Sequence, residues 1–113
     1  MTWNFRITVR GRFADLDDDQ RRRLRAAQSE HDMFAARFTP EGTFLYTPEL
    51  VFFQHRFLID VDEADPDDAE ELAQLKGEDH ATADLDRRGF AGTVTEVSAV
   101  CVENIKTRSG RRS

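Results

Sequence analysis

The stretch Val51-Phe52-Phe53-Gln54-His55-Arg56-Phe57-Leu58-Ile59-Asp60-Val61 decides the fold of this chain. Its odd-numbered residues are apolar except for one histidine, and its even-numbered residues are mostly polar or charged. A period of two places one row of side chains in a core and the other row on the opposite face of a sheet. We therefore predict a central strand over residues 51–61.

The N-terminal half predicts a strand, a helix and a hairpin. Trp3, Phe5, Ile7 and Val9 alternate with polar residues, which indicates a half-buried strand over 3–10 that we expect Gly11 to end. A helix follows from about residue 17 to His31 with a thin apolar stripe. We expect short strands over 34–38 and 43–47, joined by a turn at 39–42 that contains a proline and a glycine.

The C-terminal half predicts a second helix and a last strand. Asp65-Pro66-Asp67-Asp68 combines an N-cap acceptor, a proline at the first helical position and early carboxylates. Arg88-Gly89-Phe90 indicates the end of this helix. Its predicted inner face is the set Ala69, Leu72, Ala73, Lys76, His80 and Ala83. Residues 93–102 are rich in Val and Thr and predict a strand.

The order β-α-β-β-β-α-β is typical of an α+β domain with the ferredoxin-like split β-α-β arrangement. We expect an antiparallel sheet of four to five strands with two helices on one face and the other face open. Residues 1–105 form the single predicted domain, and residues 106–113 are expected to be a basic, disordered tail.

Composition narrows the classes of function. Cys101 is the only cysteine in 113 residues, so no disulfide forms within the chain, and we expect a cytoplasmic protein. No stretch approaches the about 18 apolar residues of a membrane span. The net charge of -6 argues against nucleic-acid binding. Phosphate-loop, zinc-protease and serine-hydrolase motifs are absent from the sequence, so no catalytic motif is recognisable.

The segments Phe5 to Phe13 and Phe38 to Gly42, together with His31-Asp32 and Arg88-Gly89-Phe90, resemble a family of small actinobacterial proteins known only as a domain of unknown function. That resemblance implies no activity. Acylphosphatases share the predicted topology, but the residues after Gly11-Arg12 lack the further glycines of their phosphate loop.

Arginines supply the candidate ligand-binding residues. Arg6, Arg10, Arg37 and Arg56 fall on rows expected to face away from the helices. Guanidinium groups bind carboxylate and phosphate through paired hydrogen bonds, so they could bind a small anionic ligand or an acidic protein partner. The alternative is a solvated face on which these arginines pair with Asp60 or Glu96.

Two functions remain open at this stage. The first is a non-catalytic binding or assembly domain, homodimeric, whose contact surfaces are the open sheet face, which carries Phe52 and Leu58, and the acidic second helix. The second is a cofactor-independent enzyme acting on a small organic molecule in a cleft between sheet and helices, with His31 and Asp32 as acid and base.

The three histidines, His31, His55 and His80, all fall on rows assigned to the interior. Three imidazoles could bind a metal ion, but we predict that each is hydrogen-bonded separately and that they do not form one cluster. We predict neither a metal nor a cofactor.

Overall fold

A computed structural model of the chain describes residues 2–31 and 37–102. The elements follow one another as β1 (Thr2–Ala14), α1 (Asp18–Ala26), the 3-10 helix η1 (Gln28–His31), β2 (Thr43–Tyr46), β3 (Phe52–Asp62), α2 (Pro66–Arg87) and β4 (Ala91–Cys101).

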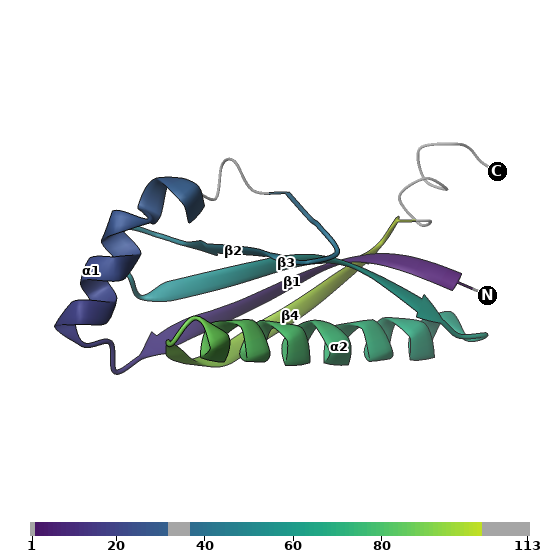
Figure 1. The fold of residues 1–113 in the computed structure, drawn as a ribbon. Coiled ribbons are helices and arrows are strands. Elements are labelled where there is room, and N and C mark those ends of the chain that lie inside the picture. Colours follow the sequence, from purple (N-terminus) through teal and green to yellow (C-terminus); the bar gives the residue numbers. More distant parts are fainter. Residues whose placement is uncertain (1, 32–36, 103–113) are drawn as a thin grey trace.

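The strands form one antiparallel sheet in the order β2-β3-β1-β4 (Figure 1). The predicted central strands are confirmed, because β1 and β3 pair along their length from Thr2 opposite Asp62 to Arg12 opposite Phe52. The protein is therefore an α+β domain with a four-stranded open sheet and two α-helices.

The predicted strand over 34–38 is only partly described. Residues 34–36 lie outside the described residues, and Arg37 and Phe38 belong to no strand. Thr39 instead forms a single parallel bridge to Phe57 of β3, where its carbonyl oxygen accepts a hydrogen bond from the backbone N–H of Leu58 at 2.8 Å.

The prediction that Gly11 ends the first strand is wrong. β1 continues to Ala14, and the register of its pairing with β4 shifts between Arg10 and Gly11. A Cβ atom at position 11 would lie 2.3 Å from the ring of Phe53. Glycine is needed here because an aromatic ring packs directly on the backbone, and the strand passes through it with a bulge.

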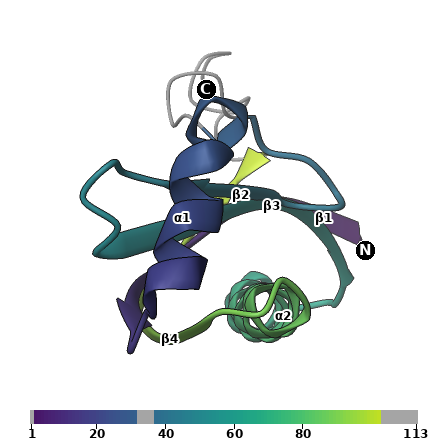
Figure 2. The same ribbon diagram turned by 60° about the vertical axis from the view of Figure 1, so that its left-hand side comes forward.

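The first helix is shorter than predicted. Asp17 and Gln20 form a capping box at its start, but α1 ends at Ala26 and the chain continues as η1. Leu24 is the one buried residue of α1. α1 stands across one end of the sheet, whereas α2 runs along a face (Figure 2). The expectation that both helices pack along the same face is met only by α2.

The second helix begins where predicted, with Asp65 as the N-cap, but it presents a different face to the sheet. Its buried residues are Ala69, Ala73, Gly77, Ala81 and Leu85. Lys76, His80 and Ala83 are exposed, so the predicted inner face is wrong at these positions. The small residues recur every fourth position and bring the helix backbone close to the sheet, where a Cβ at Gly77 would lie 2.5 Å from Ile7.

The core divides into two clusters beneath the α2 face of the sheet. One contains Phe5, Ile7, Phe57 and Ile59 under α2, and the other contains Phe13, Phe44, Tyr46 and Phe53 between Leu24 of α1 and Leu85 of α2. Cys101 is buried, as a small apolar residue would be. Within the described residues, no helix is both long and apolar enough to cross a membrane.

Candidate functional site

The sheet face opposite α2, called the open face below, carries alternate residues of β1, β3 and β4. Arg6 of β1 lies between Leu58 of β3 and Val100 of β4 in the strand register. Phe52 follows on the same face of β3, opposite Arg12, with 53% of its surface exposed. Phe52, Leu58 and Val100 are large hydrophobic residues that remain exposed in the described chain. The open face is therefore a mixture of guanidinium groups and apolar side chains.

Two of the predicted arginines meet on one aromatic ring. The Cζ atom of Arg6 lies 5.8 Å from the ring centroid of Phe38, and that of Arg56 lies 5.7 Å from it. The Nε atom of Arg56 also donates a hydrogen bond to Oε1 of Gln54 at 2.6 Å. These contacts fix two guanidinium groups beside each other on the open face.

The other two predicted arginines make different contacts. Arg10 lies farther along β1 and forms an ion pair with Glu96 at 3.3 Å, one of the cross-strand pairs that the sequence left open. Arg37 is exposed, and its carbonyl oxygen accepts a hydrogen bond from Oγ1 of Thr43 at 2.6 Å.

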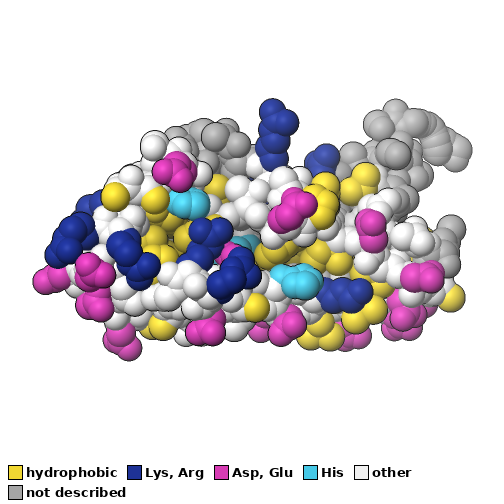
Figure 3. All heavy atoms as spheres, viewed as in Figure 1, with side chains coloured by type: hydrophobic (Ala, Val, Ile, Leu, Met, Phe, Trp, Pro, Cys, Tyr) yellow, Lys and Arg dark blue, Asp and Glu magenta, His cyan; other side chains and the backbone are white. Residues whose placement is uncertain are grey.

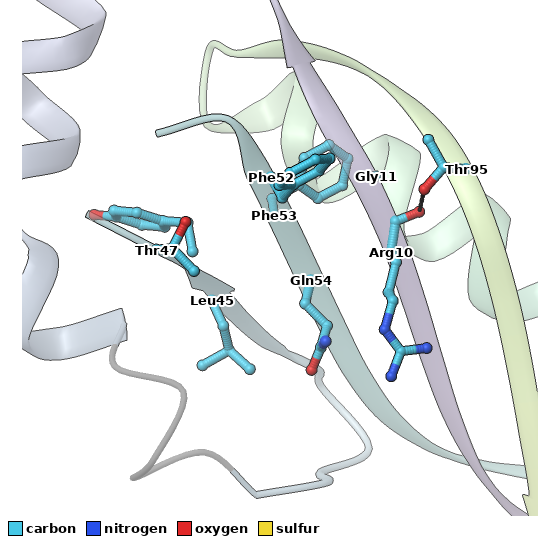
Figure 4. Close-up of a pocket in the computed structure, with 9 residues that line it drawn as sticks. Arg10, Gly11, Leu45, Thr47, Phe52, Phe53, Gln54 and Thr95 are labelled. Carbon is cyan, nitrogen blue, oxygen red and sulfur yellow. Dashed lines mark hydrogen bonds between the residues drawn. The ribbon is translucent and has the colours of Figure 1, made fainter. Parts of the chain in front are cut away.

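A pocket of about 210 Å³ opens near Arg10 on this face. Leu45, Phe52, Gln54 and Arg10 point into the region shown in Figure 4, where Thr95 donates to the carbonyl oxygen of Arg10 at 3.2 Å. The walls are mostly apolar, and the polar side chains among them are those of Arg10, Gln54, Thr47 and Thr95. This volume is below the about 300–1,000 Å³ of typical small-molecule sites.

A second set of side chains, in which polar groups alternate with aromatic rings, lies on the α2 side of the sheet. We call it the histidine seam and define it as His31, Phe44, His55, Phe57, His80, Asp84 and Arg88. The ring centroids of successive members are 5.4 Å apart for His31 and Phe44, 4.9 Å for Phe44 and His55, 5.9 Å for His55 and Phe57, and 5.9 Å for Phe57 and His80. Figure 3 shows histidine, arginine and acidic side chains gathered along this side of the molecule around apolar ones.

His55 is the most buried polar side chain of the seam, with 1% of its surface exposed. Its Nε2 atom lies 2.9 Å from Oδ2 of Asp84, which also accepts a hydrogen bond from Nε of Arg88 at 2.7 Å. Arg87 binds the other oxygen of the same carboxylate. The Nδ1 atom of His55 is buried and has no hydrogen-bond partner among residues 2–31 and 37–102.

Burial and charge set the protonation of this pair. Burial lowers the pKa of His55, and the hydrogen bond and charge of Asp84 oppose that shift. The pKa of Asp84 is lowered as well: burial raises it, but the hydrogen bonds from Arg88 and His55 outweigh that effect. His55 is therefore a neutral imidazole that donates through Nε2 to an ionised carboxylate, and Nδ1 carries a free lone pair.

Of the predicted acid and base, only His31 lies in the described residues. Nδ1 of His31 donates to the carbonyl oxygen of Phe44 at 2.8 Å, and Asp32 lies outside the described residues. The prediction that each imidazole has its own hydrogen-bond partner is confirmed for His31, which binds the carbonyl oxygen of Phe44, and for His55, which binds Asp84 through Nε2. The three imidazoles are separated by Phe44 and Phe57. Residues 2–31 and 37–102 contain no group of three or more metal-binding side chains.

Sequence reasoning missed Asp84 and Arg88 as members of a site. Arg88 stands in the sequence as part of the Arg88-Gly89-Phe90 signal that ends α2, and Asp84 stands in no recognisable motif. The spacing of four residues between them allows both to approach one point from the last turn of α2.

Residues 1–113 match the sequence model of a family described as "Family of unknown function (DUF6204)", and the chain belongs to that family. No curated protein and no solved structure matches the chain.

Proposed function

We propose that this member of the DUF6204 family is a cytoplasmic binding domain that pairs with a second copy of itself through the open face. The observation that carries the proposal is the exposure of Phe52, Leu58 and Val100 on the sheet face opposite α2. Apolar side chains gathered on one face favour a protein contact, and a sheet face can pair with itself across a two-fold axis.

The pocket beside Arg10 supports a protein partner over a small metabolite. Its volume of about 210 Å³ suits one inserted side chain better than a whole ligand. The exposed ring of Phe52 lies at the rim of the same pocket, so two copies in an isologous contact would each offer a ring and a recess.

We also infer the ferredoxin-like topology for this domain. Six of its elements follow the order β-α-β-β-α-β, and β1 and β3 are the central pair of the sheet. In such an arrangement the helix-free face is the natural one for pairing. The guanidinium groups of Arg6 and Arg56 would then lie within the contact and could hold a carboxylate of the partner or a small anion.

Sedimentation equilibrium tests the self-association. The variant with Leu58→Ser and Val100→Ser should dissociate at least about tenfold more readily than the unchanged protein, because each copy loses two apolar contacts. Leu75→Ser is the matched control, since Leu75 is 60% exposed but lies on α2. A monomeric unchanged protein at every concentration, or equal effects of both variants, would contradict the proposal.

The arginines are tested separately. Replacing Arg6 and Arg56 together by alanine should weaken self-association or remove the response to added phosphate. Arg37→Ala is the control, because Arg37 is exposed outside the strands. If the double variant keeps both its mass and its phosphate response, these arginines are ordinary solvated side chains.

A further inference from the structure

We propose that residues 17–31, which contain α1 and η1, form a lid that detaches from the sheet and unfolds as one unit while the rest of the domain stays folded. The lid packs against the core cluster that contains Phe13, Phe44, Tyr46 and Phe53. It lies at one end of the sheet (Figure 2), and its detachment does not depend on the function proposed for the open face.

Little apolar surface attaches the lid to the sheet. Leu24 is the one buried residue of α1, and η1 has none, whereas α2 buries a row of residues along its whole length. Burial of apolar surface is the main favourable contribution to docking, so the lid is held less firmly than α2. The ion pairs of Asp18 and Asp19 with arginines lie within α1 and do not connect it to the sheet.

The other attachments are mainly hydrogen bonds between side chains and backbone carbonyl groups. They join Gln20 to Gly89, Arg23 to Arg88, Gln28 to Tyr46, His31 to Phe44 and Tyr46 to Leu24. Arg23 and His31 also contact aromatic rings. Water replaces such hydrogen bonds when the lid detaches, so their net contribution to its docking is small.

Two features of the closed form favour detachment. Oε1 of Gln28 is buried and has no hydrogen-bond partner among residues 2–31 and 37–102. A buried acceptor without a partner is unfavourable, and this oxygen regains hydrogen bonds to water when the lid opens. Asp15, just before the lid, has a φ of 51°, in the left-handed region that non-glycine residues adopt rarely. Rotation at Asp15 can release this strain, which makes it the hinge of the lid.

The lid unfolds when it detaches because α1 has only 9 residues. Isolated helices shorter than about 12–15 residues are marginal in water. Docking and helix formation are therefore coupled, and the amides of α1 should become accessible to solvent through one common opening. The opening also uncovers the rings of Phe44 and Tyr46, whose centroids lie 5.4 Å and 5.3 Å from that of His31 in the closed form.

Hydrogen exchange of the unchanged protein under native conditions tests the lid. The amides of residues 21–27 should share one protection factor, at least about 30-fold lower than that of the paired amides of β1 and β3. A smaller difference, or protection factors in α1 that vary from residue to residue without a common value, would overturn the proposal.

Two variants separate opening of the lid from unfolding of the whole domain. Tyr46→Phe removes the hydroxyl group that donates to Leu24 and should accelerate exchange in α1 about fivefold. Ile7→Val, in the core cluster under α2, should accelerate exchange in β1 and β3 about fivefold and leave α1 unchanged. If Ile7→Val accelerates exchange in α1 as much as in β1, the helix opens only with the whole domain and the lid does not exist.

Discussion

Replacing Asp84 by alanine should destabilise the domain by about 2.5 kcal/mol. The Nε2–H group of His55 would lose its acceptor while remaining buried, which costs about 1–3 kcal/mol. The pairs with Arg87 and Arg88 contribute about 0–1 kcal/mol each, because these side chains are 72% and 36% exposed. The higher helix propensity of alanine offsets about 0.5 kcal/mol of this loss in the free energy of unfolding.

Urea unfolding followed by tryptophan fluorescence measures this loss. Trp3 is the only tryptophan, and its Nε1 atom donates to the carbonyl oxygen of Glu63 at 3.0 Å, so its signal reports separation of β1 from the end of β3. In a thermal unfolding experiment, the melting temperature of the Asp84→Ala variant should be about 10 °C lower than that of the unchanged protein. Asp86→Ala, an exposed position on the same helix, should stay within about 0.5 kcal/mol of the unchanged protein. Equal losses for the two variants would refute a stabilising role for the pair of Asp84 and His55.

Three further outcomes are expected. Because burial lowers the pKa of His55 below its ordinary value of 6.5, the unfolded chain binds more protons at this residue. The stability that His55 contributes is therefore complete above about pH 6.5 and is lost as the pH falls. Urea unfolding from about pH 8 to about pH 5 should show this decrease in the free energy of unfolding. The decrease should be smaller in the His55→Gln variant. Gly42→Ala should lower the free energy of unfolding by at least about 2 kcal/mol, because φ is 93° and the new Cβ would lie 2.1 Å from the ring of Phe57. Gly89→Ala has a similar φ of 86° but no ring beside it, so the loss in the same assay should be about 1 kcal/mol. Tyr46→Phe should lower the unfolding free energy by about 1 kcal/mol, because the buried hydroxyl donates to a backbone carbonyl of α1.

The strands could be predicted because their pattern is local. In β1 and β3 the buried residues alternate along almost the whole strand, and each strand is long enough for the period of two to be unambiguous. The same logic placed Arg6 and Arg56 on the open face. It did not predict that both would contact Phe38, because that residue is in no strand and its position depends on the bridge between Thr39 and Phe57.

The role of Gly11 could not be predicted from the local sequence, because tertiary packing determines it. Gly11 has the local appearance of a strand terminator, but the strand continues because the partner strands hydrogen-bond on both sides of it. The reason for glycine at position 11 is the ring of Phe53, which lies about 40 residues away in the sequence and directly against the backbone in space.

The site in the histidine seam could not be assembled from the sequence because it depends on how α2 is rotated about its axis. Alternation in β3 predicted that His55 faces the interior, which is confirmed. The helix was assigned an inner face through Lys76 and His80, a row that Asp84 continues one turn later, but Lys76 and His80 are exposed. The repeat of small residues from Ala69 to Ala81 every four positions was the available signal, since such a row lets a helix backbone approach a sheet closely. When this row faces the sheet, Leu85 continues it at the end of the helix. Asp84 then lies beside the row and can reach His55 on the central strand. The carboxylate therefore serves as a hydrogen-bond partner of His55, although its sequence context of acidic residues suggests a solvated face.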